Sequence, residues 1–503
     1  MLTIYKLKNI LPLFFLIIIF FGIFVRSVEV LNHNYVFGFD QGREYLVLRE
    51  IVVSHKLRLI GAEIGSGSAG FTGIFQGPFF YYLLLPTFIL FQGDPYGGIV
   101  IMFLFGIGAI GFIYFLIYKI FGYFYGLLAA ALVSISPPLI SQSRFLWSPH
   151  PGTFFILLAF YFIYYIKKNN RNIFLSSFFS GFIYNFEFAT AVPMSIGLIL
   201  YCLLICKLRK VKQYLYLIGG FLCAFSPMVI FEFKHNFQGI KGLLSYFSES
   251  KHSFINLMEI IKGVQGIFIA FMNSYIDSFP KQNLVSGWII IAIVLIIVCI
   301  AVYKEKEESI KHFILYLFIL PLTGVLTYLF LRVPVYPYYL IDLNLSFVIF
   351  ICYCILFTSK NRNYLILSLL SIFILVQVLQ FIPFSINNFI KDYSDYGGDA
   401  KIKGKMDAID YVYKDAKGKK FGLLVFTPPV YTYTYDYILL WYAQKKYNYI
   451  PYKDKKGLFY LIMEVDPQKP WSYKGWLETV IKSGKIIETV KLPSGIIVQK
   501  RNG

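Results

Sequence analysis

The sequence predicts an α-helical polytopic membrane protein of about eleven spans with a small C-terminal α/β domain. Of the 503 residues, 57% are hydrophobic and only 15% are charged, and the mean hydropathy is +0.64. Soluble domains carry about 25% charged residues, so this composition favours a chain that lies mostly in lipid. The apolar residues also come in long runs, and a run of about 20 crosses a bilayer as a helix.

The basic residues indicate how the chain is oriented. The net charge of +20 is gathered in clusters between apolar runs, as in the cytoplasmic loops of membrane proteins, so we predict no nucleic-acid partner. Lys6 and Lys8 precede the first run and place the N-terminus in the cytoplasm. We therefore predict a multi-pass protein of the cell membrane whose C-terminal domain is extracytoplasmic.

The predicted spans are apolar runs bounded by polar residues. They cover residues 10–28, 96–118, 121–140, 154–166, 173–184, 189–206, 214–231, 284–303, 313–330, 338–357 and 364–384. The run at 79–91 is short for a span, so we interpret it as re-entrant or interfacial. Residues 44–59 predict an amphipathic helix on the membrane surface, or an ordinary helix packed over the bundle. Residues 236–283 are expected to form a long outer loop.

Two domains follow from the change in composition near residue 387. Residues 1–386 form the predicted transmembrane domain, with a long first outer loop at 29–94, and residues 387–503 form the extracytoplasmic domain. In the second domain we expect helices at 399–414, 435–443 and 476–482, strands at 421–426 and 457–465, and a hairpin of 485–491 with 496–500 around Pro493-Ser494-Gly495.

Several common catalytic and cofactor signatures are excluded. The six cysteines all fall in apolar runs, which is typical of buried hydrophobes rather than of disulfides or zinc sites. Gly65–Gly70 matches the dinucleotide-binding glycine pattern, but no βαβ unit surrounds it, so we interpret it as a mobile loop. The sequence contains no zinc-hydrolase, nucleophile-elbow or Walker motif.

The first polar loop holds the main candidate for chemistry. Asp40, Arg43 and Glu44 follow the first span, and the two carboxylates share one face if a helix begins at Asp40. A carboxylate beside a cation is able to accept a proton from a hydroxyl group. Asp40 is also a favoured helix cap, and the two roles are compatible. With an outer carboxylate, Asp40 and Glu44 would also offer oxygen ligands to a divalent cation, an alternative that the sequence leaves open.

Other ionisable residues gather at the predicted outer ends of spans rather than at span centres, where a transport path would place them. They are Arg144, His150, Glu187, Glu232, Lys234, His235 and Arg332. The basic residues of this set would hold a leaving phosphate, and aromatic residues such as Trp147 would stack on a sugar. This combination suits glycosyl transfer from a lipid phosphate. Each has a simpler alternative: the arginines are interface anchors, and the histidines are surface residues.

The order of several segments resembles the GT-C superfamily of membrane glycosyltransferases, nearest to bacterial relatives of protein O-mannosyltransferases and aminoarabinose transferases. The resemblance covers about residues 1–385. The segments are Phe39–Glu44, Gly77–Tyr82, Phe121-Gly122, Ser136-Pro137 with Ser143-Arg144, and Phe231–Phe237.

The resemblance implies a polyprenyl-phosphate-linked sugar as donor, inverting transfer at the outer face, and Asp40 as general base. Two departures stand out. Gln76-Gly77 replace the family's basic residue, so Arg43, Lys234 or His235 would hold the phosphate, with Arg144 as a further candidate. Ser148 and His150 stand near the position of a second acidic residue, which would then be Glu44, Glu187 or Glu232.

A glycosyltransferase is therefore the expected function, with Asp40 and Glu44 as catalytic candidates. The expected partners are the lipid-phosphate sugar, membrane lipids, and an acceptor glycan, lipid or protein. No cofactor is predicted with certainty. The alternatives are a non-enzymatic transporter of lipid-linked glycans, and a ligase or polymerase that joins whole glycans.

Overall fold

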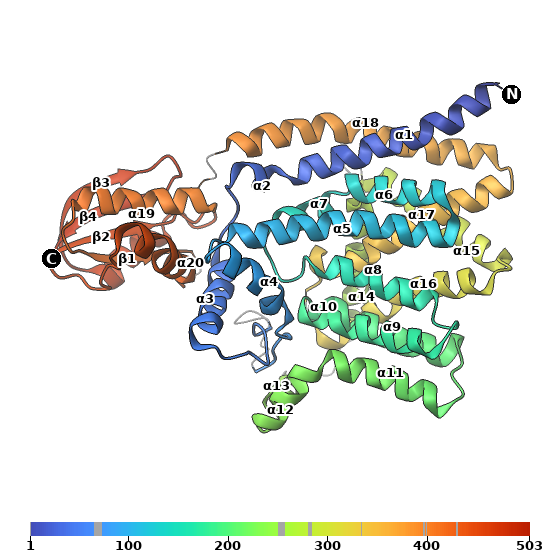
Figure 1. The fold of residues 1–503 in the computed structure, drawn as a ribbon, viewed down its shortest axis with the longest axis horizontal. Coiled ribbons are helices and arrows are strands. Elements are labelled where there is room, and N and C mark those ends of the chain that lie inside the picture. The colour runs from blue at the N-terminus through green and yellow to red at the C-terminus, as the bar shows by residue number, and fades with distance from the viewer. Residues whose placement is uncertain are drawn as a thin grey trace.

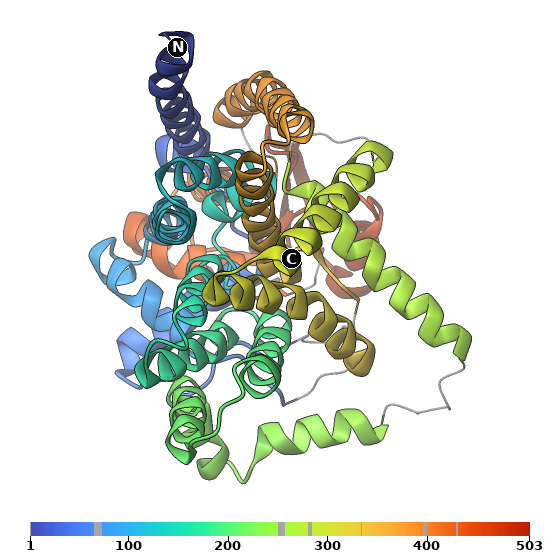
Figure 2. The ribbon, with the colours of Figure 1, turned by 90° about the vertical axis from the view of Figure 1, so that its right-hand side faces the viewer.

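The computed structural model confirms a helical membrane protein with a small C-terminal sheet domain. It describes residues 2–64, 73–249, 257–279, 284–332, 334–395, 398, 400–428 and 431–503, so the Gly65–Gly70 loop lies outside the described residues. The helices form an elongated bundle, with the N-terminus at one end and the sheet domain at the other (Figure 1). Viewed along the bundle from the N-terminal end, the sheet domain lies behind the helices (Figure 2).

All of the runs predicted as spans fold as helices. In chain order these are α1 (Leu2–Arg26), α5 (Tyr96–Phe121), α6 (Tyr123–Ile135) with α7 (Pro137–Arg144), α8 (Gly152–Tyr164), α9 (Asn170–Phe182), α10 (Phe188–Leu200), α11 (Val211–Ala224) with α12 (Ser226–Lys234), α15 (Leu284–Lys304), α16 (Glu308–Leu331), α17 (Ile341–Lys360) and α18 (Tyr364–Ser394). Among the described residues, 6 segments are long and apolar enough to cross a membrane, or up to 8 if each bent pair is one span.

The predicted outer loop at 236–283 is wrong, because it contains α13 (Gln238–Glu249) and α14 (Leu257–Asp277). Helix α14 buries Ile267, Phe271 and Tyr275 in the core of the bundle. Polar residues such as Glu259 and Lys262 interrupt its apolar run, so it lacks the continuous hydrophobic stretch that identifies a span. Packing of one face, rather than overall hydropathy, stabilises it.

The break between α6 and α7 is stabilised by a buried arginine. Pro137 follows Ser136 and the two helices meet at 66°, because proline lacks the N–H that would continue the helix. The Arg26 guanidinium is 1% exposed and donates to the carbonyls of Ser134 at 2.7 Å and Val133 at 2.8 Å. The negative end of the α6 dipole thus offsets a buried positive charge.

The C-terminal domain has a four-stranded sheet in the order β1-β2-β4-β3. Strands β1 (Gly422–Phe426) and β2 (Leu458–Met463) are parallel, whereas β4 (Ile497–Asn502) is antiparallel to both β2 and β3 (Lys485–Lys491). The predicted hairpin and helices are confirmed, the latter as α19 (Ile402–Ala416), α20 (Tyr433–Ile438) with 439–443, and α22 (Ser472–Trp476) with 477–481. The predicted domain boundary at 386/387 falls inside α18.

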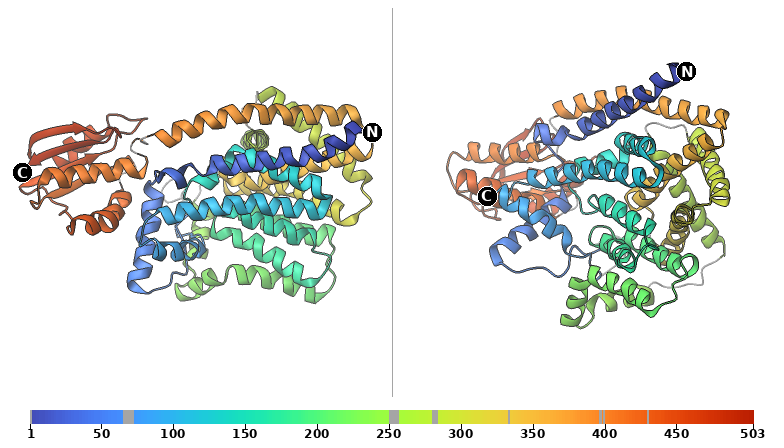
Figure 3. Two further views of the ribbon diagram at one scale, coloured as in Figure 1. Left: turned by 45° about the horizontal axis from the view of Figure 1, so that its top comes forward. Right: turned by 45° about the vertical axis from the view of Figure 1, so that its right-hand side comes forward.

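The sheet domain packs against the segment between α1 and α5, which forms α2 (Val28–Asn32), α3 (Phe39–Ser54) and α4 (Phe79–Leu90). Tyr45 of α3, Leu84 of α4 and Ile409 of α19 belong to one hydrophobic core. Helix α3 is therefore an ordinary packed helix, the second of the two alternatives predicted for this segment. Figure 3 shows the sheet domain at the end of the bundle beside α3. It also shows α18 alongside α1, after which the chain enters the sheet domain.

Candidate active site

The site begins at the N-terminal turn of α3. Gly38 precedes the helix, and its N–H donates to the Gln41 side-chain oxygen at 2.9 Å. The Gln41 amide in turn donates to the Leu146 carbonyl at 2.7 Å, which ties the turn to the loop before α8. Because Gly38 and Gln41 form this helix start and Asp40 makes no capping hydrogen bond, the capping alternative for Asp40 is not realised. Its carboxylate pairs with Arg43 instead.

Arg43 joins the two predicted catalytic carboxylates. Its Nη2 lies 3.0 Å from Asp40 Oδ1 and 2.7 Å from Glu44 Oε1, and the side chains of Asp40 and Glu44 are 37% and 8% exposed. Tyr81 of α4 hydrogen bonds to Glu44, and burial raises the Glu44 pKa despite Arg43 and Tyr81. Among the described residues, Arg43 Nε is buried without a hydrogen-bond partner. Asp40 is thus the accessible carboxylate, and Glu44 is the inner one that holds Arg43.

A second cluster lies on the loop before α8 and the segment before α17. Trp147 packs against Tyr338 with ring centres 4.5 Å apart. His150 is buried, with Nδ1 2.5 Å from the Phe145 carbonyl oxygen, and burial lowers its pKa to about 4. Its imidazole is therefore neutral near pH 7 and supplies no positive charge to a phosphate. The contact with Phe145 ties His150 to the start of the 145–150 loop.

Glu187 is the buried acid of this region. Its carboxylate accepts from the Ala189 N–H at 3.1 Å, which caps α10. Burial raises its pKa to about 8. It also acts electrostatically on Tyr338 and Tyr339, so it borders the aromatic segment 336–339. Of the acids considered for the second acidic position, Glu187 is the one beside Trp147 and these tyrosines.

The Gln76-Gly77 departure from the family pattern has a structural basis. Gln76 Nε2 donates to the Phe186 carbonyl at 3.3 Å, and the Phe79 N–H donates to Asn185 Oδ1 at 3.3 Å. A Cβ at Gly77 would lie 2.0 Å from Asn185 Oδ1, so glycine is required for this approach. These contacts bring the start of α4 against the loop that carries Glu187.

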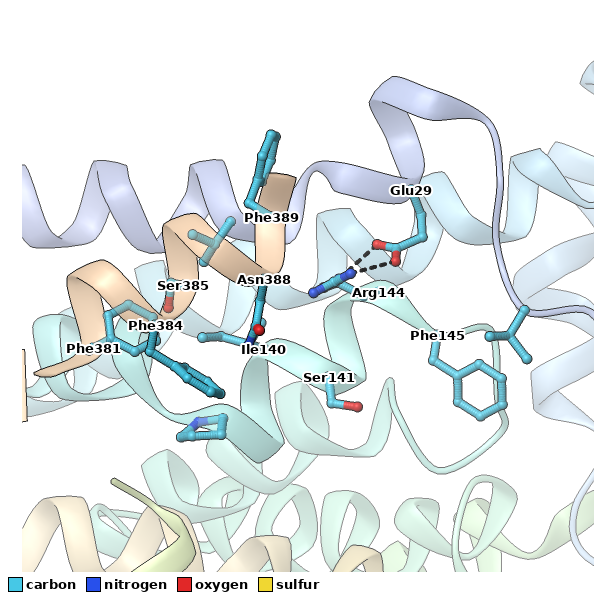
Figure 4. Close-up of a pocket in the computed structure, with 13 residues that line it drawn as sticks. Glu29, Ile140, Ser141, Arg144, Phe145, Phe381, Phe384, Ser385, Asn388 and Phe389 are labelled. Carbon is cyan, nitrogen blue, oxygen red and sulfur yellow. Dashed lines mark hydrogen bonds and ion pairs between the residues drawn. The ribbon is translucent and has the colours of Figure 1, made fainter. Parts of the chain in front are cut away.

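Arg144 is engaged by two carboxylates. Its Nε and Nη2 lie 2.8 and 2.7 Å from the Glu29 oxygens, and its Nη2 also lies 2.6 Å from Asp392 Oδ2. Figure 4 shows Arg144 directed at Glu29, beside a cavity of about 440 Å³ walled by α18 residues such as Phe384. These ion pairs link α2, α7 and α18, and the phosphate-binding role of Arg144 stays a prediction.

The remaining predicted site residues lie at the ends of α12 and α16. Glu232 accepts from the N–H groups of Gly239 and Ile240, at 2.9 and 3.1 Å, at the start of α13, and it lines a cavity of about 310 Å³. Lys234 is exposed. His235 is also exposed and stacks on Phe231 with ring centres 4.3 Å apart.

Phe231 contacts Phe75, the residue before Gln76. Lys234 and His235 therefore lie on the helix that adjoins the start of α4. Arg332 caps α16 and lines a cavity of about 780 Å³ together with Lys262. Within the described ranges, no three His, Cys, Asp or Glu side chains gather as a metal site would require.

Two of the residues described here were not assigned a role from sequence. Tyr81 lies in the Gly77–Tyr82 segment, and its place one turn after Gly77-Pro78 was the only signal available. Tyr338 lies in the aromatic run that follows Arg332. Both contribute through contacts with distant segments, which spacing along the chain does not reveal.

Comparison with known proteins now places the fold. Residues 76–231 match the family model described as dolichyl-phosphate-mannose-protein mannosyltransferase. The chain also resembles the crystal structure of ArnT from Cupriavidus metallidurans bound to undecaprenyl phosphate, with a TM-score of 0.54 and 11% identity over 96% of this chain and 97% of that one. The protein has the GT-C fold.

The apo structure of the same Cupriavidus metallidurans ArnT aligns with a TM-score of 0.46 and 12% identity, over 99% of this chain and 98% of that one. Comparison with curated proteins gives no significant match. The match to the undecaprenyl-phosphate-bound ArnT structure confirms, for the fold, the GT-C resemblance noted from the sequence.

Proposed function

We propose that this GT-C protein transfers a sugar from a polyprenyl-phosphate donor to an acceptor hydroxyl at the outer face of the cell membrane. The observation that carries the proposal is Asp40, a partly exposed carboxylate 3.0 Å from the Arg43 guanidinium. It stands where α3, α4 and the 145–150 loop meet. The donor class is supported by the mannosyltransferase family model and by ArnT, whose structure holds undecaprenyl phosphate.

In the proposed reaction, Asp40 accepts the proton of the acceptor hydroxyl. The hydroxyl oxygen forms a bond to the anomeric carbon while the bond from that carbon to the phosphate oxygen breaks. The phosphate leaves with the electron pair, and the configuration at carbon is inverted. Arg43, Lys234, His235 and Arg332 are the proposed cations for the phosphate, since charge-assisted contacts stabilise the leaving group.

Glu44 has a different proposed role from Asp40. It is almost fully buried, bonded to Tyr81 and 2.7 Å from Arg43. These contacts fix the guanidinium rather than expose the carboxylate to an acceptor. We assign Glu44 as a positioning residue for Arg43, which leaves Asp40 as the base.

The proposed orientation places the N-terminus in the cytoplasm and the C-terminal domain outside. Lys167, Lys210 and Lys306 belong to different inter-helix loops, and such basic loops remain in the cytoplasm. The N-terminus and the sheet domain lie at opposite ends of the bundle (Figure 1). We also propose the division into a transmembrane domain and an extracytoplasmic domain that this arrangement supports.

The test compares transfer by the wild type, Asp40→Asn and a control in purified detergent-solubilised protein. The substrates are radiolabelled polyprenyl-phosphate monosaccharides with membrane-lipid or peptide acceptors. Glu50→Gln is the control because Glu50 lies on α3 and pairs only with Arg58 near the surface, at 2.5 Å. Loss of a general base lowers the rate by about 10²–10⁴-fold, whereas Glu50→Gln is expected to keep wild-type transfer.

Transfer that survives in folded Asp40→Asn would remove Asp40 from the mechanism and direct attention to Glu44 or Glu187. Transfer only from lipid-linked oligosaccharides would indicate a ligase or polymerase. No transfer from any donor, together with flux of a labelled lipid-linked glycan across liposomes, would establish a transporter instead.

A further inference from the structure

Three aromatic rings meet where α3 joins the C-terminal domain. Tyr431 and Tyr433 are stacked with ring centres 5.5 Å apart and planes 15° from parallel. Phe39 of α3 lies 5.5 Å from the Tyr431 ring and 5.2 Å from the Tyr433 ring. Tyr431 is 59% exposed, so the outer ring of the stack is open. The stack is therefore accessible from the Tyr431 side.

The stack is fixed to the helix that carries the candidate base. Phe39 immediately precedes Asp40, and the Arg43 guanidinium carbon lies 5.6 Å from the centre of the Phe39 ring. On the other side, Gly42 approaches the Tyr433–Thr434 backbone so closely that a Cβ would lie 2.4 Å from the Thr434 nitrogen. These contacts fix the stack to the first turns of α3, the helix that carries Asp40.

A polar rim borders the rings. Asp436 accepts from Thr432 Oγ1 at 2.8 Å and pairs with Lys453 at 2.7 Å. These groups offer both donors and acceptors near the stack.

We propose that Phe39, Tyr431 and Tyr433 form a carbohydrate platform that holds a sugar ring of the acceptor beside Asp40. The face of an aromatic ring is negative, and the C–H face of a pyranose is weakly positive and apolar, so the two stack. The sugar hydroxyls at the edge would bond to the tyrosine hydroxyls and the polar rim. That the bound sugar belongs to the acceptor rests on the proposed transferase function, whereas sugar binding by the rings does not.

Sugar binding is tested first, without turnover. Full-length protein in detergent is titrated with methyl β-glucopyranoside, methyl β-galactopyranoside and methyl N-acetyl-β-glucosaminide by saturation-transfer NMR, with cyclohexanol as an apolar probe. At least one glycoside is expected to bind the wild type, and Tyr431→Ala is expected to weaken it by tenfold or more. Trp471→Ala is the matched control, because Trp471 is 64% exposed on the same domain and outside the stack.

The proposal is overturned if no glycoside binds, if Tyr431→Ala binds as the wild type does, or if Trp471→Ala weakens binding equally. Equal binding of cyclohexanol would also overturn it, because the rings would then be an unspecific apolar patch. Tyr433→Phe keeps the ring and the fold, and it is expected to retain most of the affinity.

Kinetics separate this proposal from the proposed function. With an acceptor that is turned over, Tyr431→Ala is expected to raise the acceptor KM by about tenfold and leave kcat and the donor KM unchanged. Asp40→Asn is expected to keep glycoside binding while it loses transfer. Glycoside binding without transfer from any donor would support the platform and refute the transferase, whereas a Tyr431→Ala effect on kcat alone would refute the platform.

Discussion

Replacing Gly42 with alanine tests the junction between α3 and the C-terminal domain. The new Cβ would lie 2.4 Å from the Thr434 nitrogen and 2.6 Å from the Tyr433 carbonyl carbon. Non-bonded atoms of this kind prefer about 3.5 Å, so α20 must move by about 1 Å. Both neighbours are backbone atoms, so no side-chain rotation relieves the clash.

The expected cost follows from two opposing terms. Overpacking destabilises by about 1–3 kcal/mol, and the better helix propensity of alanine returns up to about 1 kcal/mol. A net loss of about 1–2 kcal/mol would increase the open population of the junction by about 5- to 30-fold. The rings at 431 and 433 would shift with α20, so binding of the glycoside probes is expected to weaken as well.

The assay is hydrogen–deuterium exchange of the α20 amides, Tyr433–Ile438, in purified protein. Gly42→Ala is expected to accelerate their exchange by the same factor, and Gly111→Ala serves as the control because a Cβ there meets no atom within 4 Å. Unchanged α20 exchange in Gly42→Ala, with α3 still helical, would refute the close approach of these two elements.

Three further predictions follow from the pairs around the site. Arg144→Met leaves Glu29 buried and unpaired. Breaking a fully buried ion pair costs about 3–5 kcal/mol. Because the Arg144–Glu29 pair is partly exposed, its loss should lower the free energy of unfolding by roughly 2–3 kcal/mol, which thermal unfolding would measure. The Arg144→Met/Glu29→Gln double variant should recover part of that loss, and a double variant as unstable as the single one would contradict it. The pKa of Glu187 is about 8 in the folded protein, whereas that of an unfolded glutamate is about 4.3. At any pH between these two pKa values the native state binds one more proton than the unfolded state. Its stability should therefore fall as pH rises through this window; Glu187→Gln should flatten the profile, and an unaltered slope would count against it. Tyr81→Phe removes a hydrogen bond to Glu44 and should lower the unfolding free energy by about 1 kcal/mol, which denaturant titration would measure.

Much of the architecture was predictable because the hydropathy of a segment depends only on the residues of that segment. Residues 96–118 and 364–384 form continuous apolar runs, and both fold as long helices. The hairpin at 485–500 was predictable from the alternation of its strands around a turn. Helix α14 was missed because its polar residues face one side, and only the partner helices reveal which side is buried.

The site was predicted in part. Asp40, Arg43 and Glu44 are neighbours in sequence, and a helix brings them together whatever surrounds them. Arg144 is paired with Glu29 and Asp392, which lie far along the chain, whereas His150 is buried and bonded to Phe145 of its own loop. Sequence pattern shows that such residues are charged or titratable, but not whether another group neutralises them.

The sequence by itself determined the membrane class, the helical spans, the C-terminal sheet domain and the Asp40-Arg43-Glu44 turn. Each of these depends on local composition, periodicity or spacing of a few residues. The tertiary structure alone decided which carboxylate is exposed, which cations are already paired, and that Tyr431 and Tyr433 lie against Phe39. Burial and ion pairing depend on segments hundreds of residues apart, and only the packed chain brings these segments together.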